Sequence, residues 1–419
     1  MTVEFRPGDD GYDQARRVFN TAIDARPAVI VRCAGIDDVR RALETARAGG
    51  LPFSVRAGGH GIAGHAVAAG GVVADLRGLR DIGVADGVAT VGAGCTWGEL
   101  AARLEGLGLA TPGGFDARIG VAGLTLGGGY GLLTRLHGLA CDNLAGADVV
   151  LADGTVARAE DDPDLLWALR GAGANFGAVT SLRLRVHHLP PLSAGVLVFP
   201  FHRDVLRRYR EVELADEVTA YLGVETRTGH IFVTVFHLGE PADADRRLAP
   251  LRALGTPVHA DFGPRLYTEA NAASHHSFPE GHHHRWRACF LDTLDDGAIE
   301  ALAAHARAAG VYIVIEHLGG AMGRMASTAT AFPHRGARFG VAVAVKWRPP
   351  ETPPAAAEEL HAALWPSASG TYVNYLNADY TAEDVVAAYR LNLPRLSLLK
   401  GRYDPGNVFR SNVNLPVTT

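Results

Sequence analysis

The chain has 419 residues, of which 47% are hydrophobic, and a formal net charge of −5 at pH 7. This length suggests two domains with sizeable cores, and the small charge without a basic cluster argues against nucleic acid or a membrane as a partner. No apolar run reaches the roughly 18–20 residues that span a bilayer. The N-terminus does not resemble a secretory signal, and four scattered cysteines favour reduced thiols. We therefore expect a cytoplasmic protein.

The first 190 residues alternate helical and β patterns, as in a two-lobed α/β arrangement. Helices are predicted over 12–23, 36–47, 97–107 and 164–170, and strands over 28–32, 53–56, 72–74, 88–91, 147–151, 155–159 and 179–186. The Ala-Asp-Gly turn at 152–154 predicts that two of these strands form a hairpin.

A Leu-Pro-Pro-Leu segment at 189–192 predicts a domain boundary. The longer strands predicted after it lie at 195–199, 220–225, 231–236, 311–315 and 339–345, with helices at 242–254 and 297–309. An antiparallel sheet backed by helices is a natural wall for a binding cavity. The last 45 residues are expected to hold short loops and one helix over 382–400.

Two glycine-rich segments carry the most information about function. In the first, a short β run ends at Arg56 and leads into a loop with glycines at 58, 59, 61 and 64 and His60 at its centre. The second, residues 120–131, reads Gly-Val-Ala-Gly-Leu-Thr-Leu-Gly-Gly-Gly-Tyr-Gly. Glycine lets backbone N–H groups approach an anion closely, so the two loops together predict a cofactor with a diphosphate. Neither has the spacing of a Rossmann fingerprint or a P-loop.

These segments resemble the berberine bridge enzyme-like FAD-linked oxidases of the vanillyl-alcohol oxidase superfamily. Residues 56–60 (Arg-Ala-Gly-Gly-His) resemble the flavin-attachment motif, and further matches follow in the family's order at 120–131, 138–143, 164–177, 330–335, 372–375 and 403–409. The resemblance implies an α+β fold with three parts. These are a two-lobed α/β FAD-binding domain of the PCMH type (1–190), a substrate domain (191–370) with an antiparallel sheet backed by helices, and a C-terminal segment (371–419) that returns to the FAD domain.

The resemblance also implies FAD bonded covalently through its 8α-methyl group to a ring nitrogen of His60. Such a bond withdraws electrons from the flavin and makes it a stronger hydride acceptor. Some members add a cysteinyl link. Here Asp116 aligns with that cysteine and Cys141 lies after the glycine segment, so we expect no cysteinyl link. The alternative for His60 is a loop histidine bonded to backbone, and a metal site with His65 lacks further ligands.

Ile119 aligns with a position that lines the oxygen pocket in this family. Isoleucine in place of a valine there predicts slow reoxidation by O₂, and an ordinary buried aliphatic side chain is the alternative. The residues expected to contact the cofactor are Arg56, Ala57, Gly58, Gly59, His60, Gly61, Ile62, Gly64, His65, Asp116, Ile119, Gly120, Gly123, Gly127, Gly128, Gly129, Tyr130, Gly131, Val179, Tyr375 and Asn377.

The resemblance places the second tyrosine of Tyr372-Val-Asn-Tyr375 near the reactive face of the flavin. We expect this segment to be a strand, with Tyr372 and Tyr375 on opposite faces. A tyrosine with a pKa of about 10 is a poor base, so it needs nearby positive charge or a hydrogen bond that stabilises the tyrosinate, and His334 or Arg335 is expected to supply either one. Tyr375, Tyr372 and His334 are thus the candidate catalytic residues, and a packed aromatic strand is the alternative.

Two further histidine motifs are open to more than one interpretation. Residues 275–284 contain five histidines and Glu280, which permits a metal site, although we favour a solvated loop at the mouth of the substrate domain. Glu316 and His317 follow a hydrophobic strand, where they either line the cavity or form a structural pair. We predict no metal.

The predicted function is that of an FAD-dependent oxidase that removes two electrons from a small organic substrate, which the resemblance associates with secondary metabolism. O₂ or another acceptor would regenerate the flavin. The alternatives are a flavin-dependent dehydrogenase or cyclase with a non-oxygen acceptor, and a resistance protein that binds a metabolite stoichiometrically. The substrate and the oligomeric state cannot be deduced from these motifs.

Overall fold

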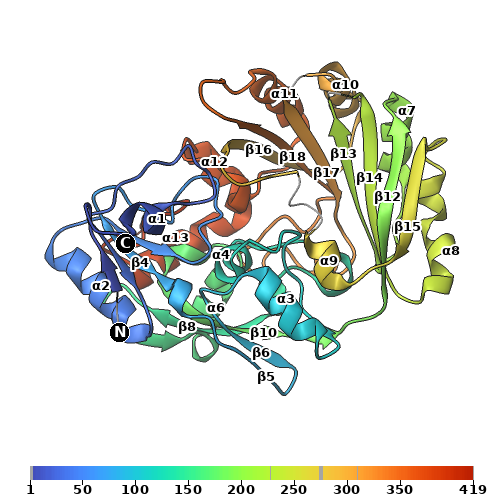
Figure 1. Ribbon diagram of the computed structural model, residues 1–419. Coiled ribbons are helices and arrows are strands. Elements are labelled where there is room, and N and C mark those ends of the chain that lie inside the picture. Colours follow the sequence, from blue (N-terminus) through green and yellow to red (C-terminus); the bar gives the residue numbers. More distant parts are fainter. Residues whose placement is uncertain (1–2, 227, 273–276, 309, 419) are drawn as a thin grey trace.

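The computed structural model describes residues 3–226, 228–272, 277–308 and 310–418. The strands of this described part form a four-stranded, a five-stranded, a two-stranded and a seven-stranded sheet. The seven-stranded sheet stands on one side of the molecule, and the four- and five-stranded sheets lie on the other with both chain ends (Figure 1). The α+β fold class is confirmed.

The four-stranded sheet, in the order β1-β2-β4-β3, presents the first glycine loop at its edge. The strands β2 (Val29–Arg32), β4 (Val72–Asp75) and β3 (Phe53–Arg56) are parallel, and β1 (Val3–Phe5) is antiparallel to β2. Helix α2 (Ile36–Ala48) buries Val39, Leu43 and Ala46 at helical spacing against this sheet. Strand β3 lies at the edge of the sheet, and its carboxyl end leads directly into residues 57–65.

Helix α1 (Tyr12–Arg16) is much shorter than the predicted 12–23, and the reason lies in Arg56. Its guanidinium donates hydrogen bonds to the carbonyl oxygens of Ala15 and Arg17. The N–H of Phe19, which a continuing helix would pair with Ala15, instead donates to Gly59 at 3.0 Å. The chain therefore leaves the helix at Arg17 and runs along the glycine loop.

The five-stranded antiparallel sheet has the order β5-β6-β10-β8-β9. Its strands are β5 (Ile82–Ala85), β6 (Val88–Gly92), β10 (Ala178–Arg185), β8 (Leu144–Val150) and β9 (Val156–Arg158). The predicted hairpin is the β8–β9 pair. Nearby elements are α3 (Trp97–Glu105), β7 (Leu109–Ala110), α4 (Val121–Leu126), α5 (Thr134–His137), α6 (Pro163–Leu169) and β11 (His187–His188), which pairs with β7.

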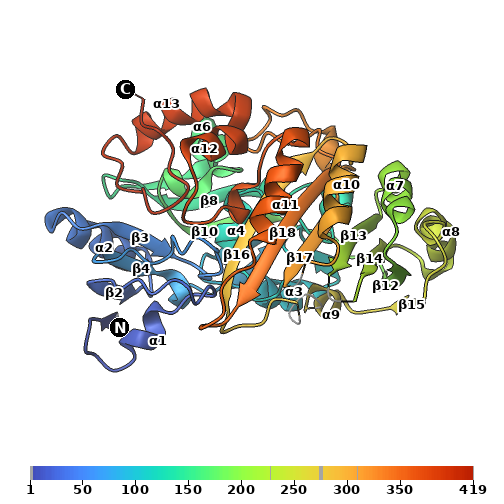
Figure 2. The same ribbon diagram turned by 90° about the horizontal axis from the view of Figure 1, so that it is seen from above.

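The seven-stranded sheet is antiparallel throughout, in the order β15-β12-β14-β13-β17-β18-β16. Its strands are β15 (His259–Pro264), β12 (Leu192–Pro200), β14 (His230–Leu238), β13 (Val218–Glu225), β17 (Val311–His317), β18 (Phe339–Trp347) and β16 (His283–Leu291). Helices α7 (Arg203–Glu211), α8 (Pro241–Arg252), α10 (Asp296–His305) and α11 (Ala356–Leu364) cover its outer face (Figure 2). Helix α9 (Tyr267–Ala272) contacts α3.

The two faces of this sheet differ because strand side chains alternate. Ile313, Ile315 and Val343 belong to the apolar core beneath the helices. Their strand neighbours, such as Glu316 and Ala344, therefore point to the opposite face, where Ala344 packs with Ile62 of the glycine loop. This face is the wall that the sequence pattern predicts.

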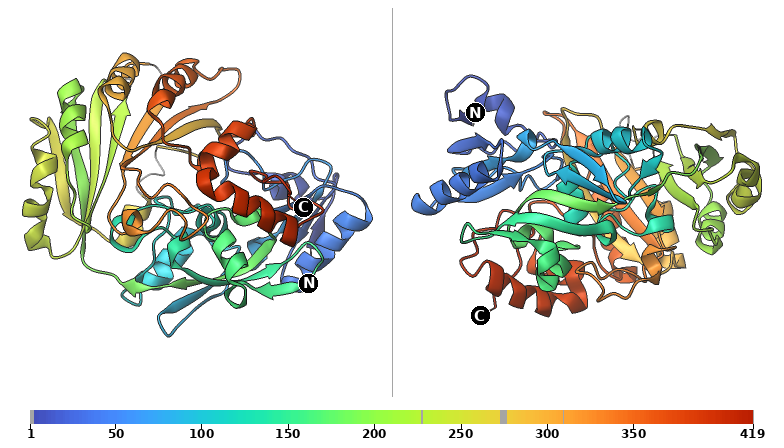
Figure 3. Two further views of the ribbon diagram at one scale, coloured as in Figure 1. Left: turned by 180° about the vertical axis from the view of Figure 1, so that it is seen from behind. Right: turned by 90° about the horizontal axis from the view of Figure 1, so that it is seen from below.

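The chain returns to the first sheets at its C-terminus (Figure 3). The predicted single helix over 382–400 is wrong, because α12 (Ala382–Tyr389) and α13 (Leu393–Tyr403) are separated at Arg390, whose φ is 47°. Lys400 of α13 is fully buried, where its ammonium contacts Asp404 at 2.6 Å and donates to the carbonyl of Asn175. This contact fastens the C-terminal helix to residues that precede β10.

The predicted boundary at residue 190 falls between β11 and β12. Residues of α12 and α13 share an apolar cluster with the two smaller sheets. The division into 1–190, 191–370 and 371–419 stays a prediction. Within the described ranges, the helices are too short or too polar to cross a membrane.

Candidate active site

The two glycine-rich segments lie against each other and form one wall of a cavity. A Cβ on Gly58 would stand 2.6 Å from the backbone nitrogen of Gly120, and a Cβ on Gly120 would stand equally close to the nitrogen of Gly58. Only glycine permits backbones to approach in this way. Segments far apart in the sequence thus meet through their backbones.

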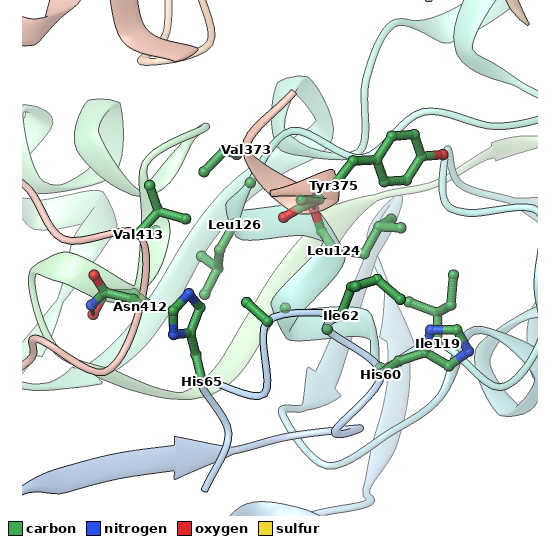
Figure 4. A pocket seen from close by; sticks show the side chains of 18 of the residues that line it. His60, Ile62, His65, Ile119, Leu124, Leu126, Val373, Tyr375, Asn412 and Val413 are labelled. Carbon is green, nitrogen blue, oxygen red and sulfur yellow. Dashed lines mark hydrogen bonds between the residues drawn. The ribbon is translucent and has the colours of Figure 1, made fainter. Parts of the chain in front are cut away.

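The cavity has a volume of about 290 Å³ and is lined by these segments, by the C-terminal segment and by Trp286 of β16. Figure 4 shows His60, Ile119 and Tyr375 around it. The predicted residues that line it are Ala57, Gly58, Gly59, His60, Gly61, Ile62, His65, Asp116, Ile119, Gly120, Gly123, Gly127, Tyr130, Tyr372 and Tyr375. Sequence reasoning missed Phe115, Phe278, Trp286 and Asn412, which also line it. No local motif marks these side chains, because the fold alone brings them to the cavity.

Several predicted contacts lie behind the wall instead of on the cavity surface. Gly64, Gly128, Gly129, Gly131, Val179 and Asn377 are not among its lining residues. The N–H of Gly129 donates to the Tyr372 hydroxyl at 2.9 Å, and Val179 is buried in β10. Asn377 holds the backbone of Trp286, which does line the cavity. These residues support the wall.

Arg56 is also outside the lining, and the expectation that it contacts the cofactor is not supported. Its side chain is 4% exposed and turns toward the carbonyl groups of Ala15 and Arg17. Arg56 therefore holds the N-terminal segment against the glycine loop.

The predicted strand over 372–375 is wrong, because residues Val373–Tyr375 form a turn of 3₁₀ helix. The N–H of Tyr375 donates to the carbonyl of Tyr372 at 3.0 Å. This i→i+3 bond puts the two tyrosines on the same face instead of opposite faces, and their ring centroids are 4.9 Å apart. Both rings consequently line the cavity.

Glu316, on strand β17 of the seven-stranded sheet, is the buried acid of this site. The Tyr375 hydroxyl donates to its Oε1 at 3.3 Å, and the Tyr130 hydroxyl also hydrogen-bonds to its carboxyl group. The absence of a side chain at Gly340 leaves room for the carboxyl, since a Cβ there would lie 2.7 Å from Oε2. Glu316 is 1% exposed, and burial raises its pKa to about 8 despite the two tyrosine hydrogen bonds.

Neither expected cation stands beside Tyr375. The His334 ring stacks on Phe290 and bonds the carbonyl of Ala388 at 2.9 Å, and burial lowers its pKa to about 4. Arg335 forms a buried ion pair with Asp142. Burial first, and then the charge of Glu316, raise the pKa of Tyr375 well above its ordinary value. The expectation that His334 or Arg335 activates Tyr375, by charge or by a hydrogen bond, is therefore wrong, because the partner of the Tyr375 hydroxyl is the carboxyl group of Glu316.

The structure bears on both histidine motifs that the sequence left open. His275 and His276 lie outside the described residues, whereas His284 is 2% exposed and so does not belong to a solvated loop. No cluster of metal ligands occurs in the part of the chain that the structure describes. His317 points away from Glu316 and bonds the carbonyl of Val212 at 3.0 Å.

The cavity fits the flavin that the sequence implies. Glycines line much of its wall, so backbone comes close to any occupant. The Nε2 atom of His65 is buried without a hydrogen-bond partner among the described residues. Asp116 in the cavity wall pairs with Arg118 at 2.6 Å. The four cysteines are buried, and none of them lines the cavity.

Comparison with known proteins identifies the family. Residues 27–160 match the family model described as FAD binding domain, and residues 371–416 match the model described as berberine and berberine like. The (R)-6-hydroxynicotine oxidase of Paenarthrobacter nicotinovorans is 34% identical over 98% of this chain and 95% of that protein. The chain belongs to the berberine bridge enzyme-like family of FAD-linked oxidases.

Solved structures of berberine bridge enzyme-like and related oxidases have the same fold. The crystal structure of 6-hydroxy-D-nicotine oxidase from Arthrobacter nicotinovorans matches with a TM-score of 0.89 and 32% identity, covering 99% of this chain and 98% of that one. A berberine bridge enzyme-like protein of Physcomitrella patens matches with a TM-score of 0.92 and 22% identity, covering 100% and 97%. This berberine bridge enzyme-like chain is therefore an FAD-linked oxidoreductase.

Proposed function

We propose that the chain carries FAD on a single covalent bond to His60 and uses it to oxidise a small ring-containing organic substrate by two electrons. The observation that carries the proposed oxidation is the hydrogen bond between Tyr375, which lines the cavity, and the buried Glu316. The proposed bond is supported by the place of His60 in the lining of the same cavity. Bound FAD would supply the acceptor for the hydride. The chain's own side chains must take the proton that leaves with it.

Tyr375 and Glu316 form a relay for that proton. Tyr375 cannot act as a free tyrosinate, because its pKa lies far above the ordinary value. It can accept a proton from a substrate O–H or N–H while it passes its own proton to Glu316. The pKa of Glu316, about 8, suits a base that works near neutral pH.

A compact, largely apolar substrate is favoured by the walls of the cavity. Phe115, Tyr130, Phe278 and Trp286 contribute aromatic surface. A relative that is 34% identical is named for oxidation of (R)-6-hydroxynicotine, so this compound, its enantiomer and simple cyclic amines are the first probes. Anaerobic mixing should bleach the flavin absorbance with the accepted probe and not with sugars.

The covalent bond is tested by denaturing the holoenzyme in acid and measuring intact mass. We expect one FAD retained in the wild type and none in His60→Ala, with the cysteines unmodified. Free release of FAD from the wild type would contradict the bond. For the relay, unchanged flavin reduction in both Tyr375→Phe and Glu316→Gln would contradict it. Tight probe binding without any bleaching would favour a metabolite-binding protein.

A further inference from the structure

A segment ahead of the glycine loop, residues 15–20, is fastened to that loop at three points. Arg56 holds the carbonyl groups of Ala15 and Arg17. The N–H of Phe19 donates to the carbonyl of Gly59 at 3.0 Å, one residue before His60. The Asn20 side chain donates to the carbonyl of Ile62 at 2.8 Å, two residues after His60.

This fastening lays the ring of Phe19 flat on the imidazole of His60. The ring centroids are 3.9 Å apart and the planes differ by 15°. The other face of Phe19 stacks on His284 of β16, at 4.4 Å and 19°. Asn20 also bridges to β16, because its side chain accepts from the N–H of His284 at 2.9 Å. The imidazole of His60 thus belongs to a three-ring stack that joins the glycine loop to strand β16.

The Phe19 ring, which is half-buried, also meets a cation. The guanidinium of Arg118 lies 5.6 Å from the ring centroid and is itself held by Asp116 and by the carbonyl of Phe278. The two stacked imidazoles and this guanidinium hold the Phe19 ring in place. A side chain that is locked in this way can fix the plane of a neighbouring ring.

We propose that Phe19 is a positioning residue for the covalent attachment of FAD to His60. The inference rests on the proposed function, because it requires the bond at His60. The plane of the His60 imidazole depends on its two side-chain torsions. Stacking on Phe19 holds the imidazole in one plane, and that plane would set how its ring nitrogen approaches the flavin methyl group. Alignment of reacting atoms of this kind can change a rate by about 100-fold.

The step that Phe19 promotes is an oxidation that the protein performs on its own cofactor. One N–H bond of His60 and one C–H bond of the 8α-methyl group break, and one N–C bond forms. The two protons and two electrons released pass to dioxygen, which becomes hydrogen peroxide. Attachment therefore needs oxygen once per chain.

The test follows attachment in full-length protein prepared without flavin and then mixed with FAD in aerated buffer. Acid precipitation at intervals gives covalent FAD, and absorbance of the desalted native protein gives total FAD. We expect Phe19→Leu to bind as much FAD as the wild type but to attach it up to about 100-fold more slowly. Phe19→Tyr should restore the rate, because it keeps the stacked ring.

Val18→Ala is the matched control, because Val18 lies in the same segment but packs into a separate apolar cluster with Tyr12 and Ile30. It should attach FAD at the wild-type rate. Equal attachment rates in Phe19→Leu and the wild type would overturn the inference alone. A parallel loss of total and covalent FAD in Phe19→Leu would also overturn it, since the ring would then support the loop as a whole. Release of all FAD from the wild type would overturn the proposed bond and this inference together.

Discussion

The hydroxyl of Tyr375 donates to Oε1 of Glu316 at 3.3 Å, which joins the C-terminal segment to the seven-stranded sheet. One partner lines the cavity and the other is 1% exposed behind it. The pair therefore links a surface that substrate can touch to a base that water cannot reach. This relationship determines how the rate and the stability should depend on pH.

Flavin reduction should depend on the ionised form of Glu316. Since its pKa is about 8, the rate should rise with pH and level off above that value. Glu316→Gln should lower the rate by about 10²–10⁴-fold, as expected for loss of a general base, and should remove this rise. Stopped-flow reduction from pH 6 to pH 10 measures both. Glu225→Gln on neighbouring β13 is the control, and an identical profile for Glu316→Gln and wild type would contradict the relay.

The same carboxyl group should make the folded protein less stable as the pH rises. Its folded pKa of about 8 lies above the ordinary value of 4.5, so the folded state binds more protons between these values. The stabilisation is full below about pH 4.5 and is lost as the pH rises through 8. Urea unfolding of wild type and Glu316→Gln should show a gap between their unfolding free energies that varies over this range. A constant gap would mean that Glu316 ionises normally in the fold.

Ile119 should limit the reaction of the reduced flavin with O₂. Its side chain lines the cavity, and a Cβ on Gly114 would lie 3.5 Å from its Cδ1. Ile119→Val opens this space and should accelerate reoxidation, at a cost of about 0.5–1.5 kcal/mol in unfolding free energy. Mixing reduced enzyme with aerated buffer measures the effect. Rapid reoxidation of the wild type itself would show that Ile119 is an ordinary aliphatic residue.

The buried Lys400–Asp404 pair should be essential to the docking of α13. Both side chains are fully buried, and Asp404 also accepts from the N–H groups of Val408 and Phe409 at 2.8 Å. Lys400→Met leaves that carboxylate unpaired and should lower the unfolding free energy by about 3–5 kcal/mol. Arg203→Met, which breaks an exposed pair with Glu300, should cost at most about 1 kcal/mol. Similar losses in the two variants would argue against a structural role for the buried pair.

The fold class, the family and the part of the site built from glycine are predictable from local sequence patterns. A residue without a side chain permits a close approach of backbone, as at Gly58 and Gly120, so the spacing of glycines alone indicates where such an approach occurs. The strands of the substrate sheet are predictable for a similar reason, since alternation indicates which side chains are buried.

Which side chains share the cavity depends on long-range packing, which no local pattern reveals. The sequence pattern predicted that Arg56 contacts the cofactor, yet its buried guanidinium binds carbonyl groups at the end of α1. The sequence pattern also predicted a cation beside Tyr375, yet the Tyr375 hydroxyl binds the carboxyl group of Glu316. Contacts between residues so distant in sequence produce no local periodicity or spacing from which they could be predicted. Their contacts arise when packed sheets meet, and the burial that this packing imposes sets the pKa values on which the proposed chemistry depends.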